Sequence, residues 1–167
     1  DGAAEPLTFT LQADIKGAVV EENEDFTGFT IEEGETIVLD LNGHSIEVED
    51  KVPENQTFIL FQNLGTFTIK DSSANGSGSV KIHNTKGWND AAATVLVRSG
   101  KWSSKSQSSI LYIQGGTLTV ESDDYIEDEN RYIANMAYVV DAFDGAQVTI
   151  SGGTLQSDYD TIRLYVQ

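Results

Sequence analysis

The sequence predicts an all-β chain whose short strands wind into a solenoid of stacked coils, and three observations indicate this fold. Short runs of β-branched and aromatic residues, bounded by Gly, Asn, Asp and Ser, fill most of the 167 residues. Several of these runs alternate apolar and polar residues, which is the period of a strand with one buried face. A step of Gly, Thr, apolar, Thr, apolar also recurs, at Gly65–Ile69 and Gly116–Val120.

The strands are expected, in chain order, at residues 7–11, 36–41, 57–61, 65–69, 94–98, 110–114, 116–120, 138–142 and 145–150. One stretch differs. From Tyr132 to Phe143 the apolar residues fall at helical spacing, which allows a short helix near 132–137. We favour an irregular excursion followed by a strand at Tyr138–Ala142, because that strand matches its neighbours in the repeat.

The repeating unit is a strand, a Gly turn, a second strand and a polar excursion of variable length. Variable excursions between recurring strands suit a solenoid, in which each coil stacks only on its neighbours. A β-sandwich also has many short strands, but it gives no reason for one step to recur, and it ranks second. Inward side chains would stack like on like, with Gly at the bends. At an assumed ~25 residues per coil, the chain gives roughly six coils.

Three segments carry a family resemblance. Glu35–Ile46 contains Leu-Asp-Leu-Asn-Gly-His-Ser-Ile, and similar coil sequences occur at 65–73 and 148–155. They resemble right-handed parallel β-helix (pectate-lyase-like) repeat proteins of bacterial cell surfaces and their phages. The resemblance covers roughly residues 28–166 and gives His44 a structural place in its turn. We therefore expect one domain, with a right-handed parallel β-helix at 28–167 and a cap or irregular first coil at 1–27.

Charge and composition exclude several classes of function. Ten Lys and Arg residues against 27 Asp and Glu give a net charge of −17. So acidic a surface argues against binding nucleic acid or anionic lipid, and no apolar run approaches the roughly 20 residues needed to span a membrane. There is no cysteine, which excludes disulfides and thiol chemistry. The composition favours an exposed, extracellular setting.

The family that the chain resembles also includes enzymes that cleave acidic polysaccharides, so the resemblance makes an enzyme an alternative. Lyases of this kind use calcium with a Lys or Arg base, and hydrolases use clustered Asp residues. No local motif in this chain matches either pattern, and a charge of −17 would repel a polyanion. We therefore expect no catalytic residues.

An acidic cluster at 121–130 is the candidate metal site. Calcium takes six to eight oxygen ligands, often from closely spaced carboxylates. The weak calcium candidates are Asp123, Asp124, Glu127, Asp128 and Glu129. The alternative is a solvated acidic loop, since the spacing does not match an EF-hand. No other cofactor is expected.

Two further features concern partners. Trp88 and Trp102 are glycan-binding candidates, because exposed aromatic rings stack on sugars; the alternative is a role in packing. The strand-like run near the C-terminus, with Ile162, Leu164 and Val166, is an assembly candidate, since a β-helix exposes unpaired edges.

These observations predict a non-catalytic extracellular structural or adhesive module, from a bacterial cell surface or a filament. It would self-associate through its coil ends or C-terminal strand, with a glycan or host-surface molecule as a further ligand. The alternative is a phage fibre or capsid-decoration protein on a virion. A polysaccharide lyase or glycoside hydrolase is the third interpretation.

Overall fold

The chain is an all-β parallel β-helix. The computed structural model describes residues 5–18, 26–50, 57–84, 91–97, 109–122, 137–143, 145–158 and 160–164. Within these ranges every regular element is a strand, and all the strand pairings are parallel. The fold class predicted from the repeat is thus confirmed. The described residues contain no helix long and apolar enough to cross a membrane.

The strands are β1 (Leu7–Thr10), β2 (Ile15–Ala18), β3 (Phe26–Ile31), β4 (Thr36–Asp40), β5 (Ser45–Asp50), β6 (Thr57–Asn63), β7 (Thr66–Lys70), β8 (Ser79–Asn84), β9 (Ala91–Val97), β10 (Ile110–Ser122), β11 (Ala137–Ala142), β12 (Gln147–Ser157) and β13 (Asp160–Leu164).

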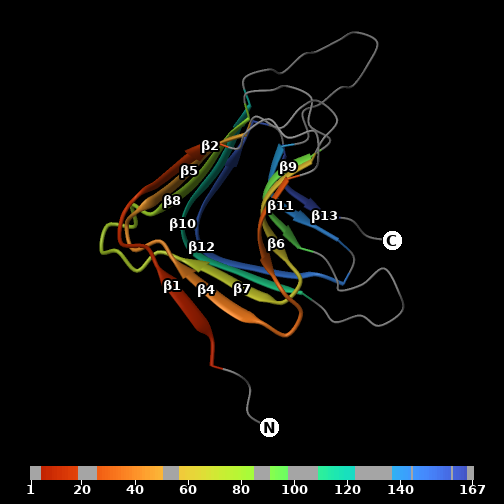
Figure 1. Ribbon diagram of the computed structural model, residues 1–167, viewed down its shortest axis with the longest axis horizontal. Coiled ribbons are helices and arrows are strands. Elements are labelled where there is room, and N and C mark those ends of the chain that lie inside the picture. The colour runs from red at the N-terminus through yellow and green to blue at the C-terminus, as the bar shows by residue number, and fades with distance from the viewer. Residues whose placement is uncertain are drawn as a thin grey trace.

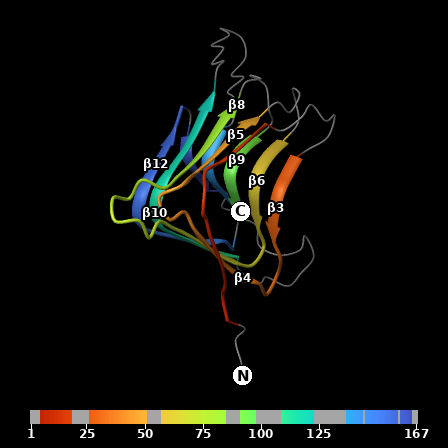
Figure 2. The same cartoon turned by 60° about the vertical axis from the view of Figure 1, so that its left-hand side comes forward.

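The strands form three faces around one interior (Figure 1). Face 1 contains β1, β4, β7 and the first parts of β10 and β12. Face 2 contains β2, β5, β8 and the second parts of β10 and β12. Face 3 contains β3, β6, β9, β11 and β13. Figure 2, turned by 60°, shows β12, β10, β8 and β5 following one another on face 2, and β9, β6 and β3 on face 3.

The described strands make five coils, where roughly six were expected. Coil 1 is β1 to β3, coil 2 is β4 to β6, coil 3 is β7 to β9, coil 4 is β10 with β11, and coil 5 is β12 with β13. Ile37 pairs with Leu7 and with Phe67, each 30 residues away. Thr66 pairs with Ile110, 44 residues on, because longer excursions enter that coil. The coils are therefore longer than the period assumed from the sequence.

Columns of like residues fill the interior, as the repeat predicts. Leu39, Ile69 and Ile113 lie in register on face 1 and are all buried. On face 2, Val80 stacks on Leu118 in the same way. Each buried aliphatic side chain contributes about 1.5–3 kcal/mol relative to an exposed one. The columns hold the three faces together.

Two other expectations concern particular segments. The strand favoured at Tyr138–Ala142 is present as β11, whereas 132–136, the region of the alternative short helix, lies outside the described residues. The boundary expected after residue 27 falls inside β3. Before it, β1 and β2 pair in parallel register with β4 and β5, so this segment supplies strands of coil 1.

Candidate functional site

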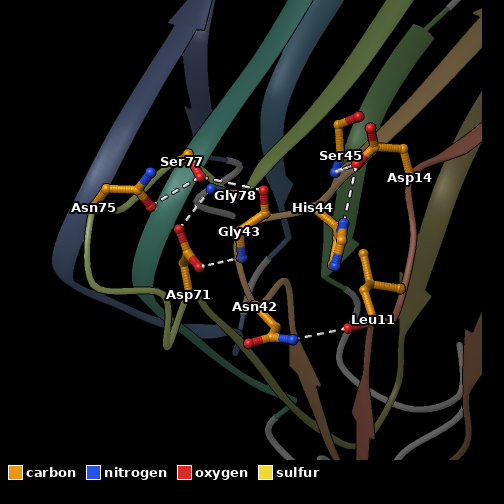
Figure 3. A network of polar contacts seen from close by, with 10 residues as sticks. All are labelled: Leu11, Asp14, Asn42, Gly43, His44, Ser45, Asp71, Asn75, Ser77 and Gly78. Carbon is orange, nitrogen blue, oxygen red and sulfur yellow. Dashed lines mark hydrogen bonds and ion pairs between the residues drawn. The ribbon is translucent and has the colours of Figure 1, made fainter.

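The corner between faces 1 and 2 holds a network of polar contacts (Figure 3). In coil 2 the chain turns at Asn42 and Gly43, whose φ angles of 48° and 81° lie in the left-handed region. The backbone N–H of His44 donates to the carbonyl of Leu41 at 2.8 Å and closes the turn. Consecutive left-handed residues are typical of a type I′ turn, which favours Asn-Gly. The Asn-Gly pair therefore directs the chain from face 1 into face 2.

Asp71 fastens this turn to coil 3. Its carboxylate accepts backbone N–H groups from Gly43 at 2.9 Å, Ser73 at 3.1 Å and Gly78 at 2.6 Å. Partial burial opposes the charged form, but these hydrogen bonds outweigh it and hold the pKa of Asp71 below its ordinary value. The carboxylate thus joins coil 3 to coil 2 through Gly43 and holds its own loop in coil 3 through Ser73 and Gly78.

Asp14 joins coil 1 to the same turn. It accepts the backbone N–H of Ser45 at 3.0 Å and lies 3.3 Å from Nδ1 of His44. The hydrogen bond from Ser45, with help from His44, lowers the pKa of Asp14. The amide of Asn42 also donates to the carbonyl of Leu11 at 3.1 Å. His44 thus takes part in a contact between coils 1 and 2, and the hydrogen bonds at this corner stabilise the stacking of the coils.

The outer surface of face 2 carries rows of alternating charge. Lys16, Glu47 and Lys81 lie in register on three neighbouring strands. Nζ of Lys16 is 2.7 Å from Glu47, and Nζ of Lys81 is 2.8 Å from Glu121. Hydrogen bonding to Glu47 raises the pKa of Lys16. Because these pairs are exposed, each adds little stability.

An open depression of about 510 Å³ lies over this surface, lined by Lys16, Gly17, Glu47, Val48, Glu49, Lys81 and His83. His83 is paired in register with Glu49 on one side and Glu121 on the other. A molecule that entered the depression would thus meet carboxylates and cationic side chains close together.

The sequence-predicted calcium and glycan residues lie outside the described residues. These are Asp123, Asp124, Glu127, Asp128 and Glu129 for calcium, and Trp88 and Trp102 for glycan. Among the residues that the structure does describe, no group of three or more His, Asp or Glu side chains is placed to hold a metal ion.

The two ends of the stack are apolar and open. Seven large apolar side chains in the described ranges are between 38% and 65% exposed: Leu7, Phe9, Ile15, Phe29, Ile150, Ile162 and Leu164. All seven belong to coil 1 or coil 5. Most of their partners in the neighbouring coils, such as Leu39, Phe61 and Ile113, are buried. The terminal coils therefore show the interior of the solenoid to solvent.

Phe29 shows how the end of coil 1 is built. Its ring stacks on that of Phe61 in coil 2, with centroids 5.9 Å apart and an interplanar angle of 25°. Phe61 in turn contacts Phe67, with centroids at 5.2 Å. Phe29 remains 65% exposed, so one side of its ring packs on the stack and the other has no cover.

Coil 5 forms the opposite end, and an ion pair holds its last strand. Arg163 on β13 donates from Nε to Asp141 on β11 at 2.8 Å. The guanidinium also lies 4.0 Å from the ring centroid of Tyr138 and donates to its hydroxyl at 3.0 Å. β13 is thereby fixed, with Ile162 and Leu164 exposed at its edge.

The sequence analysis expected association through the coil ends, but it named candidate residues only near the C-terminus and none in coil 1. Ile162 and Leu164 lie at the edge of the stack, and Val166 lies outside the described residues. In coil 1 the signal is the run Leu7–Thr10, whose alternation matches that of the inner strands and whose Leu7 and Phe9 are exposed. Comparisons with protein-family models, curated proteins and solved structures gave no match for this chain.

Proposed function

We propose that this protein is a non-catalytic structural or adhesive module of a bacterial extracellular surface, assembled through the ends of its coils. The observation that carries the proposal is the confinement of the seven exposed apolar side chains to coils 1 and 5. Soluble proteins rarely leave large apolar patches uncovered, and such patches usually mark interaction surfaces. Open strand edges beside them favour pairing with another strand.

A second copy of the chain is the occupant that fits best. In the described stack the outermost coils, 1 and 5, each have an exposed face, and the opposite end of another copy would supply a coil of the same width and strand direction. Such contact is heterologous and leaves each product with two open ends, so it leads to filaments. A phage fibre or decoration protein could use the same ends, and the neighbouring genes distinguish these two settings.

The proposal is tested by the state of association over a concentration series, measured by sedimentation velocity and negative-stain imaging. The parent chain is expected to form multimers at high concentration. Phe29→Lys should abolish them, because it places a charge on the open end. Thr68→Lys is the matched control, since Thr68 lies on β7 in coil 3. Monomers at every concentration, or equal loss in both variants, would overturn the proposal.

Binding or cleavage of polysaccharide is the second candidate, and the depression on face 2 favours it. Glu49 and Glu121 stand on either side of His83, and a pair of carboxylates is what most glycosidases use. Lys16 and Lys81 each pair with a carboxylate there, which leaves less positive charge for an acidic sugar. Release of reducing ends from pectin or alginate, lost in Glu49→Gln, would support an enzyme. No release by the parent chain would reject it.

A further inference from the structure

We propose that coil 5 of one copy docks head to tail on coil 1 of the next copy in a single register, with Val148 against Leu7. This rests on the proposed self-association and adds its polarity and its residue pairs. The register follows from the columns. Val148 pairs with Leu111, Leu111 with Phe67, Phe67 with Ile37 and Ile37 with Leu7, so the next residue in this column is Leu7 of another copy.

Five extended columns, with at least one on each face, pair apolar residues with apolar residues, whereas the column of Val48, Ile82 and Val120 ends at Gly17 and Ser157. The same continuation on the other columns gives Ile150 with Phe9, Leu155 with Ile15, Ile162 with Phe29 and Leu164 with Ile31. The exposed members of these pairs are the seven apolar side chains of the two ends. One contact therefore covers all of them.

The charges at the ends agree with this register. Extended columns place Arg163 against Thr30 and Gln156 against Lys16. In these two columns no charged side chain of coil 5 meets another of the same sign. The proposed contact therefore adds no pairing of like charges in a chain with a net charge of −17, as is also true of the register pairs between the described coils.

Face 3 disfavours slipped registers. A slip of one residue turns each apolar side chain toward the solvent side of the pleat. A slip of two residues leaves one apolar pair on this face, either Ile162 with Ile31 or Leu164 with Phe29. The unslipped register keeps both apolar pairs of face 3.

Cross-linking tests the register, because the chain has no cysteine of its own. Thr149 and Thr8 are exposed residues of one column at opposite ends of the stack. In the proposed contact they lie on adjacent strands, about 5 Å apart. The double variant Thr8→Cys with Thr149→Cys, treated with a methanethiosulfonate cross-linker of that length, should give a ladder of covalent multimers. The two single variants should form linked dimers only when mixed.

The slip control is Thr10→Cys with Thr149→Cys, which places the thiols two residues out of register. A ladder from the Thr8 double variant, and at most a trace from the Thr10 variant, supports the proposal. Multimers in sedimentation without the Thr8–Thr149 link, or with Thr8–Thr8 links, overturn the register and polarity but leave self-association standing. Monomers in sedimentation overturn both.

Discussion

Asp71→Asn is expected to loosen the corner between coils 2 and 3. The carboxylate accepts N–H groups from Gly43 and Ser73 on one oxygen and from Gly78 on the other. An amide keeps one oxygen and replaces the other with an N–H donor, so at least one backbone N–H loses its acceptor. A hydrogen bond to a charged group contributes about 1.5–3 kcal/mol, and water reaches this partly exposed corner, so we expect a loss of about 2 kcal/mol.

The assay is urea unfolding at neutral pH, with Glu33→Gln as the control for charge. Glu33 is exposed in a turn and makes the same change of one charge. The reasoning fails if Asp71→Asn costs no more than about 0.5 kcal/mol beyond this control, the usual range for surface substitutions.

The same carboxylate predicts a dependence on pH. Because hydrogen bonding outweighs burial and lowers the folded-state pKa of Asp71, its stabilisation is present above the unfolded value of about 3.9 and is lost as pH falls through the folded value. The difference in unfolding free energy between the parent chain and Asp71→Asn should therefore shrink at acidic pH. A difference that stays constant or grows as the pH falls would contradict the assignment.

Three further substitutions test separate features. The hydroxyl of Thr94 is buried and, among the described residues, has no hydrogen-bond partner. Thr94→Val should therefore raise the free energy of unfolding by about 1 kcal/mol in urea titrations. A lower free energy of unfolding in this variant would argue against burial of the hydroxyl. Gly153 has a φ angle of +87°, and a Cβ atom at this position would lie 2.6 Å from the carbonyl oxygen of Gly116. Gly153→Ala should therefore lower Tm by several degrees. Gly17→Ala is the control and should leave Tm unchanged, because no atom lies within 4 Å of a Cβ placed there. Thr30→Arg should weaken end-to-end assembly by sedimentation because it faces Arg163 of the next copy, while Thr30→Asp should preserve it; the reverse order would contradict that pairing.

The strands could be predicted from the sequence because their cause is local. Gly65–Ile69 and Gly116–Val120 carry their own alternation and bends, and both become strands with buried inward residues. The coil count was less accessible, since it rested on an assumed period of ~25 residues, whereas Ile37 and Phe67 are 30 positions apart and Thr66 and Ile110 are 44 positions apart. The distance between two strands along the sequence does not show whether they stack on each other in neighbouring coils.

The candidate sites depend on that stacking, and sequence reasoning reached them only in part. Phe29 and Phe61 are similar residues in similar strands, yet one is 65% exposed and the other is buried. The difference in exposure comes from the position of each residue in the stack, because both residues are phenylalanine. The row of Lys16, Glu47 and Lys81 likewise joins residues more than thirty positions apart, which only the register brings together.

The unequal coil lengths have a consequence for variation. Thr66 pairs in parallel register with Ile110, 44 residues on, just as Ile37 pairs with Phe67, 30 residues on. Additional chain between strands therefore leaves the pairing within the faces unchanged. Sequence can be inserted or removed at such connections while the scaffold keeps its shape. A peptide grafted between β9 and β10 would be displayed once per copy, and at regular intervals along any polymer that the copies form.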